Sequence, residues 1–175
     1  MGKIPKLTAS QENYLEMIWR LSRRGPVRVS AIARMADVRL PSVTKAIGKL
    51  VTAGLVEHDA YGVVLFTELG RQAAESVIRR DNCLFRLLTE VLCMEEKKAA
   101  MEVCRIEHVI SDGVLERLEV LVAQATDKQS QRWRTRLQAK LSELPKSMKQ
   151  GLVGCDEPHP GVQRAGDLFM ESDSN

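Results

Sequence analysis

The fold is decided by the run from Val29 to Phe66, VSAIARMADVRLPSVTKAIGKLVTAGLVEHDAYGVVLF. Apolar residues recur at helical spacing in its first part, which predicts a short helix ending near Asp37 and a longer helix opening at Pro41 and stopping before Gly54. Proline suits the first turn of a helix, and glycine suits the residue after its end. Two helices separated by three or four residues form a helix-turn-helix pattern.

The rest of this run predicts a β-hairpin. Residues 55–58 and 63–66 are rich in Val, Leu and Phe, and Gly62 between them tolerates a backbone conformation that other residues avoid. Upstream, helical spacing of apolar residues as far as Arg24 predicts a first helix, for which Thr8 or Ser10 is a suitable N-cap. Three helices followed by one hairpin make a winged helix.

Two long helices are predicted after the hairpin. The first runs from about Thr67, whose hydroxyl can cap it, to Leu92. The second begins near Glu95 and carries the apolar pattern to Ile110, with a candidate break at 111–113. Their apolar faces exceed what a small domain buries, so we expect a second subunit to cover part of them. The expected fold is mainly α, an N-terminal winged helix followed by an all-helical dimerisation domain.

The composition excludes several classes of protein. Of the 175 residues, 44% are hydrophobic and 28% are charged, which excludes wholesale disorder and collagen-like repeats. No apolar run is long enough to cross a membrane, and the N-terminus does not resemble a signal peptide. The four cysteines show no CxxC spacing, which favours reduced thiols. We therefore expect a cytoplasmic protein without a membrane partner.

Positive charge gathers in the N-terminal third, where residues 1–60 carry ten Lys and Arg against five Asp and Glu. The helix that opens at Pro41 also places small polar and basic side chains in its first turns, where a recognition helix meets the major groove of DNA. A solvated, capped helix would explain this motif by itself, but the preceding helix, the hairpin and the local charge together favour double-stranded DNA. The candidate DNA-binding residues are Arg28, Arg39, Pro41, Ser42, Thr44, Lys45, Lys49 and, at the tip of the hairpin, Tyr61.

A second motif has metal-ligand chemistry. Cys104, Glu107 and His108 are spaced so that they share one face of a predicted helix and offer a thiolate, a carboxylate and an imidazole to one ion. Asn13 and Glu16 lie one turn apart on the first helix. Taken alone, a half-buried cysteine beside a solvated Glu–His pair is the simpler interpretation.

As a set, five segments of the chain resemble the diphtheria-toxin-repressor and manganese-transport-regulator family. These segments are residues 10–16, 29–33, 41–45, 54–56 and 104–112, and the resemblance covers about residues 7–122. It implies a cytoplasmic homodimer whose winged helix and helical dimerisation domain bind Mn(II) or Fe(II) as a corepressor. The chain looks like the short type, without the SH3-like domain of longer members.

The resemblance implies six metal-ligand positions, occupied here by Asn13, Glu16, Asp81, Cys104, Glu107 and His108. Asn13 stands where the family has Asp or Met, and Asp81 stands where it has His. Phe85 and Ala100 replace ligands of the family's second site, which therefore looks lost. The remaining set of oxygen, nitrogen and sulfur donors suits Mn(II), Fe(II), Co(II) or Zn(II) without selecting among them.

We divide the chain accordingly into four segments. Residues 1–70 form the DNA-binding domain, 71–125 the helical metal-binding and dimerisation domain, 126–150 an extra basic helix, and 151–175 a loose tail. Within the third segment, the sequence favours a solvated helix face for 132–136 over a contact with the DNA backbone.

The function expected from these features is that of a metal-responsive transcriptional repressor that binds a palindromic operator as a homodimer and controls genes of metal-ion homeostasis. One alternative is a DNA-binding regulator that has lost metal control and is constitutive or responds to thiol chemistry at Cys104. A second is a winged-helix module that binds protein. A small metal hydrolase ranks last, because no general base stands beside a predicted substrate pocket, and we do not expect an enzyme.

Overall fold

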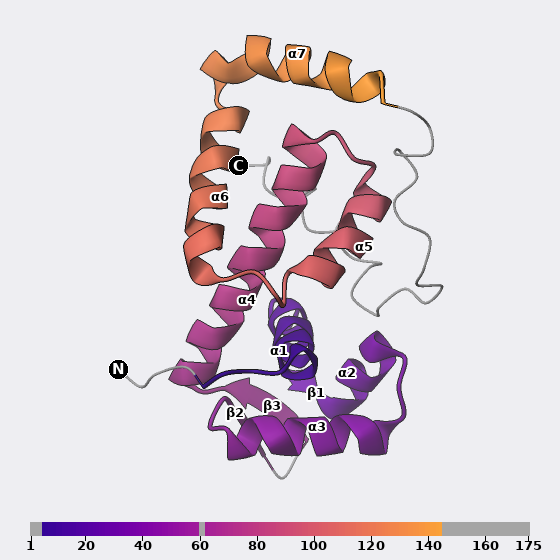
Figure 1. Cartoon of the computed structure of the whole chain (residues 1–175). Helices are drawn as coiled ribbons and strands as arrows, with labels where there is room; N and C mark the ends of the chain where they lie inside the picture. Colours follow the sequence, from indigo (N-terminus) through magenta and orange to yellow (C-terminus); the bar gives the residue numbers. More distant parts are fainter. Residues whose placement is uncertain (1–4, 60–61, 145–175) are drawn as a thin grey trace. The chain divides into compact units, whose positions relative to one another are not determined.

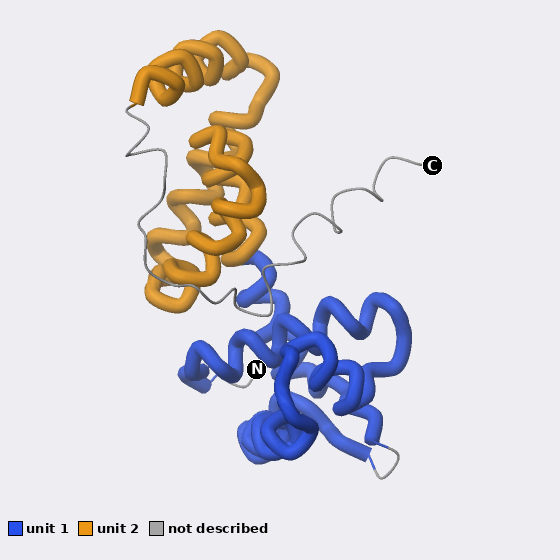
Figure 2. Tube along the Cα trace, turned by 90° about the vertical axis from the view of Figure 1, so that its right-hand side faces the viewer, with its two compact units in different colours: residues 1–79 blue, residues 80–175 orange. Residues whose placement is uncertain are grey.

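The computed structural model describes residues 5–59 and 62–144, and this part of the chain is mainly helical, with one small sheet (Figure 1). The chain divides into two compact units, Met1–Arg79 and Arg80–Asn175 (Figure 2). We call them unit 1 and unit 2. Among the described helices, none is both long enough and apolar enough to cross a membrane.

Unit 1 is a winged helix. Its elements, in chain order, are α1 Ala9–Ser22, β1 Val27–Arg28, α2 Val29–Ala36, α3 Leu40–Thr52, β2 Val56–His58, β3 Val63–Phe66 and the greater part of α4 Glu68–Arg86. The three predicted helices and the hairpin are confirmed. The three-residue turn of the helix-turn-helix begins at Asp37, which caps α2 in the left-handed conformation.

The sheet contains one strand that the sequence did not predict. Its strand order is β1-β3-β2 and both pairings are antiparallel, with Val27 opposite Val64 and Val56 opposite Phe66. β1 is only two residues long, too short to show the alternation by which a strand is identified. It forms because Val27 is buried and β3 offers it a free edge.

Local chemistry sets the ends of these elements, and of the two candidate N-caps of α1 the structure uses Thr8. The Thr8 side chain accepts a hydrogen bond from the Gln11 backbone N–H, and the Gln11 side chain accepts one from Thr8, which is a complete capping box. Gly54 and Gly62 have φ of 68° and 77°, the left-handed region that favours glycine. The N-cap of α2 is Arg28, which makes no side-chain capping bond.

The core of unit 1 joins all three helices of the winged helix to the sheet. The largest fully buried side chains come from α1, α2, α3 and the start of the hairpin, and α4 adds two small residues. The core consists of Leu15, Ile18, Val27, Val29, Ile32, Val43, Ile47, Leu50, Leu55, Val56, Val64, Ala73 and Ala74.

The junction between the hairpin and α4 is unusually close. The Thr67 hydroxyl donates to the carbonyl oxygen of Gly54 at 2.7 Å and accepts from the Gly70 N–H at 2.9 Å, so Thr67 caps α4 as predicted. The backbone of Gly70 lies directly against the Leu55 carbonyl. A Cβ added at Gly70 would stand 1.6 Å from that oxygen, which leaves space for hydrogen only.

Unit 2 is all-helical in its described part. It contains the end of α4, a π-helical turn Leu87–Val91, α5 Glu96–Ile106, α6 Asp112–Thr126, a 3₁₀ turn Lys128–Ser130 and α7 Gln131–Ser142. The π-helical turn packs against both α5 and α6, and α7 runs across the end of α6 (Figure 1). Two small apolar clusters hold these helices, one around Leu84 and Val103 and the other around Leu115 and Val122.

The second long helix ends earlier than expected. The sequence predicts helix as far as Ile110, whereas α5 ends at Ile106. The backbone N–H of Val109 bonds to the Ile106 carbonyl at 3.1 Å, a tighter turn than an α-helix makes, and Ser111 is already extended as the N-cap of α6. The chain therefore leaves the helix before 111–113, and Glu107 and His108 fall in the turn.

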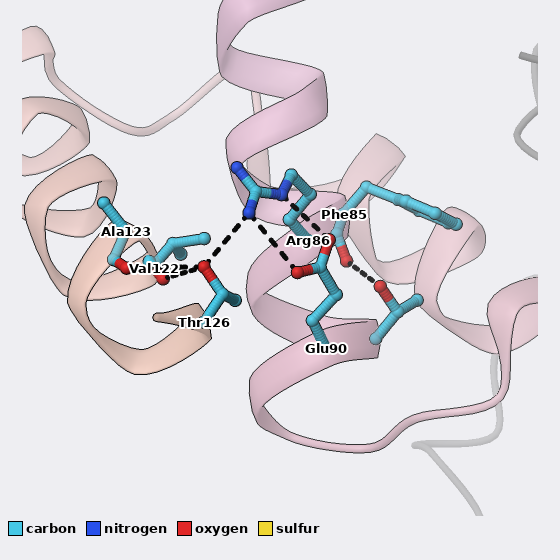
Figure 3. Close-up of polar contacts among 7 residues, drawn as sticks. Phe85, Arg86, Glu90, Val122, Ala123 and Thr126 are labelled. Carbon is cyan, nitrogen blue, oxygen red and sulfur yellow. Dashed lines mark hydrogen bonds and ion pairs between the residues drawn. The ribbon is translucent and has the colours of Figure 1, made fainter. Parts of the chain in front are cut away.

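Arg86 links α4 to α6 inside unit 2 (Figure 3). Its guanidinium donates to the Glu90 carboxylate at 2.8 Å and to the Thr126 hydroxyl at 3.2 Å. The hydrogen bond to Glu90 raises the pKa of Arg86 and outweighs the opposing effect of burial. The Thr126 hydroxyl in turn donates to the Val122 carbonyl at 2.8 Å. The Arg86 guanidinium thus joins α4 to α6, with the charged Glu90 carboxylate and the neutral Thr126 hydroxyl as its acceptors.

Part of the predicted C-terminal organisation lies outside the described residues. The predicted basic helix within 126–150 is present as α7 as far as Ser142, and residues 145–150 and the predicted tail 151–175 lie beyond the described chain. Tyr61 at the tip of the hairpin also lies outside it.

We predict that Gly70→Ala lowers the free energy of unfolding of unit 1 by about 1–3 kcal/mol, because the new methyl group would displace the Leu55 backbone. Urea unfolding in a Trp133→Phe background measures this, since Trp19 fluorescence then reports on unit 1 alone. The matched control is Gly48→Ala in α3, where the new Cβ would meet no atom within 4 Å. This substitution should raise the free energy of unfolding by about 0.5–1 kcal/mol. Equal effects of the two substitutions would contradict the close approach.

Candidate functional site

The outward face of α3 carries most of the candidate DNA-binding residues. Val43, Ile47 and Leu50 are fully buried and fix the rotation of the helix about its axis. Pro41 is exposed in the first turn. The exposed polar and basic residues on the opposite face are Ser42, Thr44, Lys45 and Lys49. The structure thus brings these predicted residues together on one helix surface of unit 1.

Two further cations stand at helix N-termini of unit 1. Arg39 is the N-cap residue of α3 and Arg28 that of α2; both are extended, exposed and without a side-chain capping bond. The free backbone N–H groups of a helix N-terminus attract anions, and an adjacent guanidinium strengthens that attraction. The Thr44 hydroxyl donates to the Leu40 carbonyl at 3.1 Å, so its oxygen remains available as an acceptor.

An open groove of about 450 Å³ lies between the start of α1 and the second half of α3. Lys45 and Lys49 line it from α3, together with Gly48 and Thr52, and Thr8 and Gln11 line it from α1. Sequence reasoning did not identify the α1 side of this groove. The capping box was the available signal, because it marks where α1 begins.

The candidate metal ligands of unit 1 are on α1. Glu16 is buried, and its carboxylate accepts a hydrogen bond from the Arg20 guanidinium one turn later. Asn13 is half-buried, one turn before Glu16. Burial raises the pKa of the neighbouring Tyr14 hydroxyl, which keeps the phenol neutral and unsuited as an anionic ligand. Glu16 therefore has a cation beside it already.

The candidate ligands of unit 2 gather at the end of α5. Glu107 is only 2% exposed, and its Oε1 lies 3.6 Å from His108 Nε2. Cys104 is half-buried, one turn earlier. The sequence placed all three on one face of a continuous helix, but only Cys104 is inside α5, because the helix ends at Ile106. The Glu107 carboxylate and the His108 imidazole are nevertheless adjacent, one hard and one borderline donor.

Asp81 is half-buried on α4. Its neighbour Arg80 directs Nη2 toward Asp112 at 3.9 Å. Within residues 5–59 and 62–144, no three side chains of His, Cys, Asp or Glu form a group that could hold a metal ion. The Glu107 carboxylate and the His108 imidazole are donors of the kinds that divalent metals accept, and the complete ligand set stays a prediction.

Comparison with known proteins assigns both units. Residues 6–64 match the family model of the iron dependent repressor N-terminal DNA binding domain. Residues 67–131 match the model of the iron dependent repressor metal binding and dimerisation domain. The first match ends inside β3, and the second begins at residue 67, between β3 and α4.

Individual relatives agree with these matches. The chain is 30% identical over 139 residues to the HTH-type transcriptional regulator MntR of Bacillus velezensis. This alignment covers 79% of this chain and 97% of that protein. The chain is also 33% identical over 113 residues to the diphtheria toxin repressor of Corynebacterium diphtheriae. This alignment covers 64% of this chain and 50% of the repressor. The solved structure of the manganese regulator SloR matches with a TM-score of 0.59 and 29% identity, over 67% of this chain and 55% of that one.

The chain thus spans nearly the whole of the MntR relative but about half the length of the diphtheria toxin repressor. The comparisons agree on one family. Two of its models follow one another along the chain, relatives are 30% or more identical, and a solved structure has the same fold. The protein belongs to the iron-dependent repressor family of metal-responsive transcriptional regulators, whose members include the diphtheria toxin repressor and MntR.

Proposed function

We propose that this protein is a cytoplasmic, metal-responsive repressor that binds a palindromic operator as a homodimer and controls genes of metal-ion homeostasis. The observation that carries the proposal is the outward face of α3, on which Ser42, Thr44, Lys45 and Lys49 are exposed together. A face of small polar and basic side chains on a helix-turn-helix is suited to the major groove.

The exposed residues divide into two roles. Ser42 and Thr44, in the first turns of α3, are short side chains that can reach base edges when the helix enters the groove. Lys45 and Lys49 line the groove against α1 and are placed to bind phosphates, as are Arg28 and Arg39 at their helix N-termini. Phosphate contacts orient the protein, and base contacts select the sequence.

Exposed apolar residues of unit 2 support a homodimer. Val109 is 80% exposed and Val120 is 65% exposed, and Val114 and Leu121 of α6 are also largely exposed. A second copy of the chain would remove this apolar surface from water. Two-fold symmetry in the protein requires two related half-sites in the operator, which is why we propose a palindrome.

For the metal site we propose donors from both units: Glu16 and Asn13 on α1, Asp81 on α4, and Cys104, Glu107 and His108 at the end of α5. A bound divalent ion would supply positive charge that several buried or half-buried acidic groups share. Because the donors belong to both units, ion binding favours the mutual arrangement of units that supplies all of them. A coupling of about 1–3 kcal/mol would change DNA affinity by about 5- to 150-fold.

One observation favours the alternative, a regulator that has lost metal control. The Arg20 guanidinium already neutralises the buried Glu16 carboxylate, as a metal ion would. For Glu16 to serve as a ligand, Arg20 must release that oxygen or share the carboxylate. Asn13 and Asp81 stand where the family has other ligands, and this difference also favours the loss of metal control. The measured metal affinity therefore decides between the two functions.

We predict that Lys45→Ala and Lys49→Ala each weaken binding to duplex DNA. Each removes one phosphate contact, so the slope of log affinity against log salt should become shallower by about 0.9. Fluorescence anisotropy with a labelled random-sequence duplex over a salt series measures both the affinity and this slope. Lys97→Ala on α5 is the matched control and should leave the slope unchanged. A wild-type affinity that does not depend on salt would remove the DNA-binding proposal.

We predict that the protein binds one transition-metal ion per subunit and that His108→Ala abolishes this binding, because it removes an imidazole donor next to Glu107. Calorimetric titration with Mn(II), Co(II) and Zn(II) measures the affinity. His58→Ala, an exposed histidine of β2, is the control. Loss of metal-dependent operator binding in His108→Ala, with the dimer retained, would support the metal-responsive function.

Arg20→Met separates the two functions in the same titration. If Arg20 competes with the metal for Glu16, the substitution should tighten metal binding by about tenfold, since a hydrogen-bonded cation would no longer have to leave. Arg24→Met, exposed after the end of α1, should not. Equally weak binding by the wild type, Arg20→Met and His108→Ala would replace the metal-responsive function with the metal-independent one.

A further inference from the structure

The last described helix, α7, is basic and has no buried residue. Residues 128–142 contain five Lys and Arg and no Asp or Glu. The family model of the dimerisation domain ends at residue 131, so α7 lies almost wholly beyond it. Neither the DNA-binding face of α3 nor the candidate metal ligands involve this helix.

The charges of α7 are ordered along its surface. Arg134, Leu137 and Leu141 are half-buried and follow one another at helical spacing, which identifies the less exposed face of α7. Arg132, Arg136 and Lys140 are exposed and spaced by four residues. They form a single row, which we call the α7 basic ridge, whose cations rise about 6 Å from one to the next along the axis.

The α7 basic ridge destabilises its own helix. Like charges four residues apart cost an isolated helix about 0.2–0.5 kcal/mol per pair. None of the three cations forms a salt bridge with any residue in 5–59 or 62–144. On α5, in contrast, Lys98 lies 3.5 Å from Glu95 and Arg105 lies 3.2 Å from Glu102. An anionic partner would remove the repulsion within the ridge.

An aromatic side chain adjoins the α7 basic ridge. Trp133 is 47% exposed, one residue after Arg132. Exposed tryptophan is a feature of binding surfaces, because it gives a large contact area and its indole N–H can donate to an oxygen acceptor. A row of cations with an indole beside it matches the phosphate backbone of a nucleic acid.

We propose that the α7 basic ridge is a second DNA-contacting surface, which binds the phosphate backbone of duplex DNA without reading its sequence. The inference rests on the proposed function, because a DNA-binding regulator already has this polyanion as its ligand. A helix that lies on a membrane needs a broad exposed apolar face. On α7 only Trp133 is an exposed large apolar residue, and Leu137 and Leu141 lie on the half-buried face.

The test compares two double variants of the full chain. Arg132→Gln with Arg136→Gln removes two cations of the ridge. The control, Lys97→Gln with Lys98→Gln, removes two cations of α5, of which Lys97 is exposed and Lys98 is half-buried and paired with Glu95. Each is titrated by fluorescence anisotropy, over a salt series, with a random-sequence duplex and with a duplex selected by the wild type from a random pool. The ridge variant should make the salt slope shallower by about two units on both duplexes, since each lost phosphate contact contributes about 0.9.

The ratio of affinities for the two duplexes should stay the same in the ridge variant, because phosphate contacts carry no sequence information. Circular dichroism should show undiminished helix content, since the substitution removes repulsion.

This inference alone would be overturned if the ridge variant kept the salt slope of the wild type while Lys45→Ala still made that slope shallower. Wild-type binding of anionic phosphatidylserine vesicles that the ridge variant loses, with an unchanged DNA slope, would also overturn it. Salt-independent or absent duplex binding by the wild type would overturn the proposed function as well.

Discussion

The burial of one stripe of α3 is the constraint on which the DNA-contacting surface depends. Val43, Ile47 and Leu50 are fully buried, and burying such side chains stabilises the fold by about 1.5–3 kcal/mol each. Rotating the helix about its axis would expose them, so its rotation is fixed. The same rotation turns Ser42, Thr44, Lys45 and Lys49 to the surface. Recognition chemistry is therefore positioned by the hydrophobic core and needs no polar scaffold of its own.

The acidic candidates for metal binding differ in how their charge is balanced. On α1, Glu16 is buried and hydrogen-bonded to Arg20, so its charge is compensated within the helix. At the end of α5, Glu107 is buried beside the imidazole of His108, which is itself a metal-ligating group. The arginine guanidinium has no lone pair to offer a metal, whereas an imidazole nitrogen is a common metal ligand. The α5 end is thus better suited to a metal, and Glu16 is the residue whose role decides the mechanism.

Much of the fold could be predicted because its signals are local. Thr8 with Gln11, Pro41, Gly54, Gly62 and Thr67 each act within a few residues of chain, through a cap, a fixed φ or a left-handed conformation, and all five do so in the structure. Helical spacing likewise identified α1 to α4. The DNA-binding face followed from the same information, since a helix with one apolar stripe presents the residues between its apolar positions to solvent.

By itself, then, the sequence determined the winged helix, the outward face of α3 and the residue types available to a metal. Only the tertiary structure decided the existence of β1, which needs the edge of β3, and the end of α5 at Ile106, after which the chain turns into α6. It also decided the pairing of Arg20 with Glu16 and the fact that no described residue neutralises the α7 basic ridge. These features depend on which groups remain in contact with water after packing, and periodicity along one chain segment carries no information about its neighbours in space.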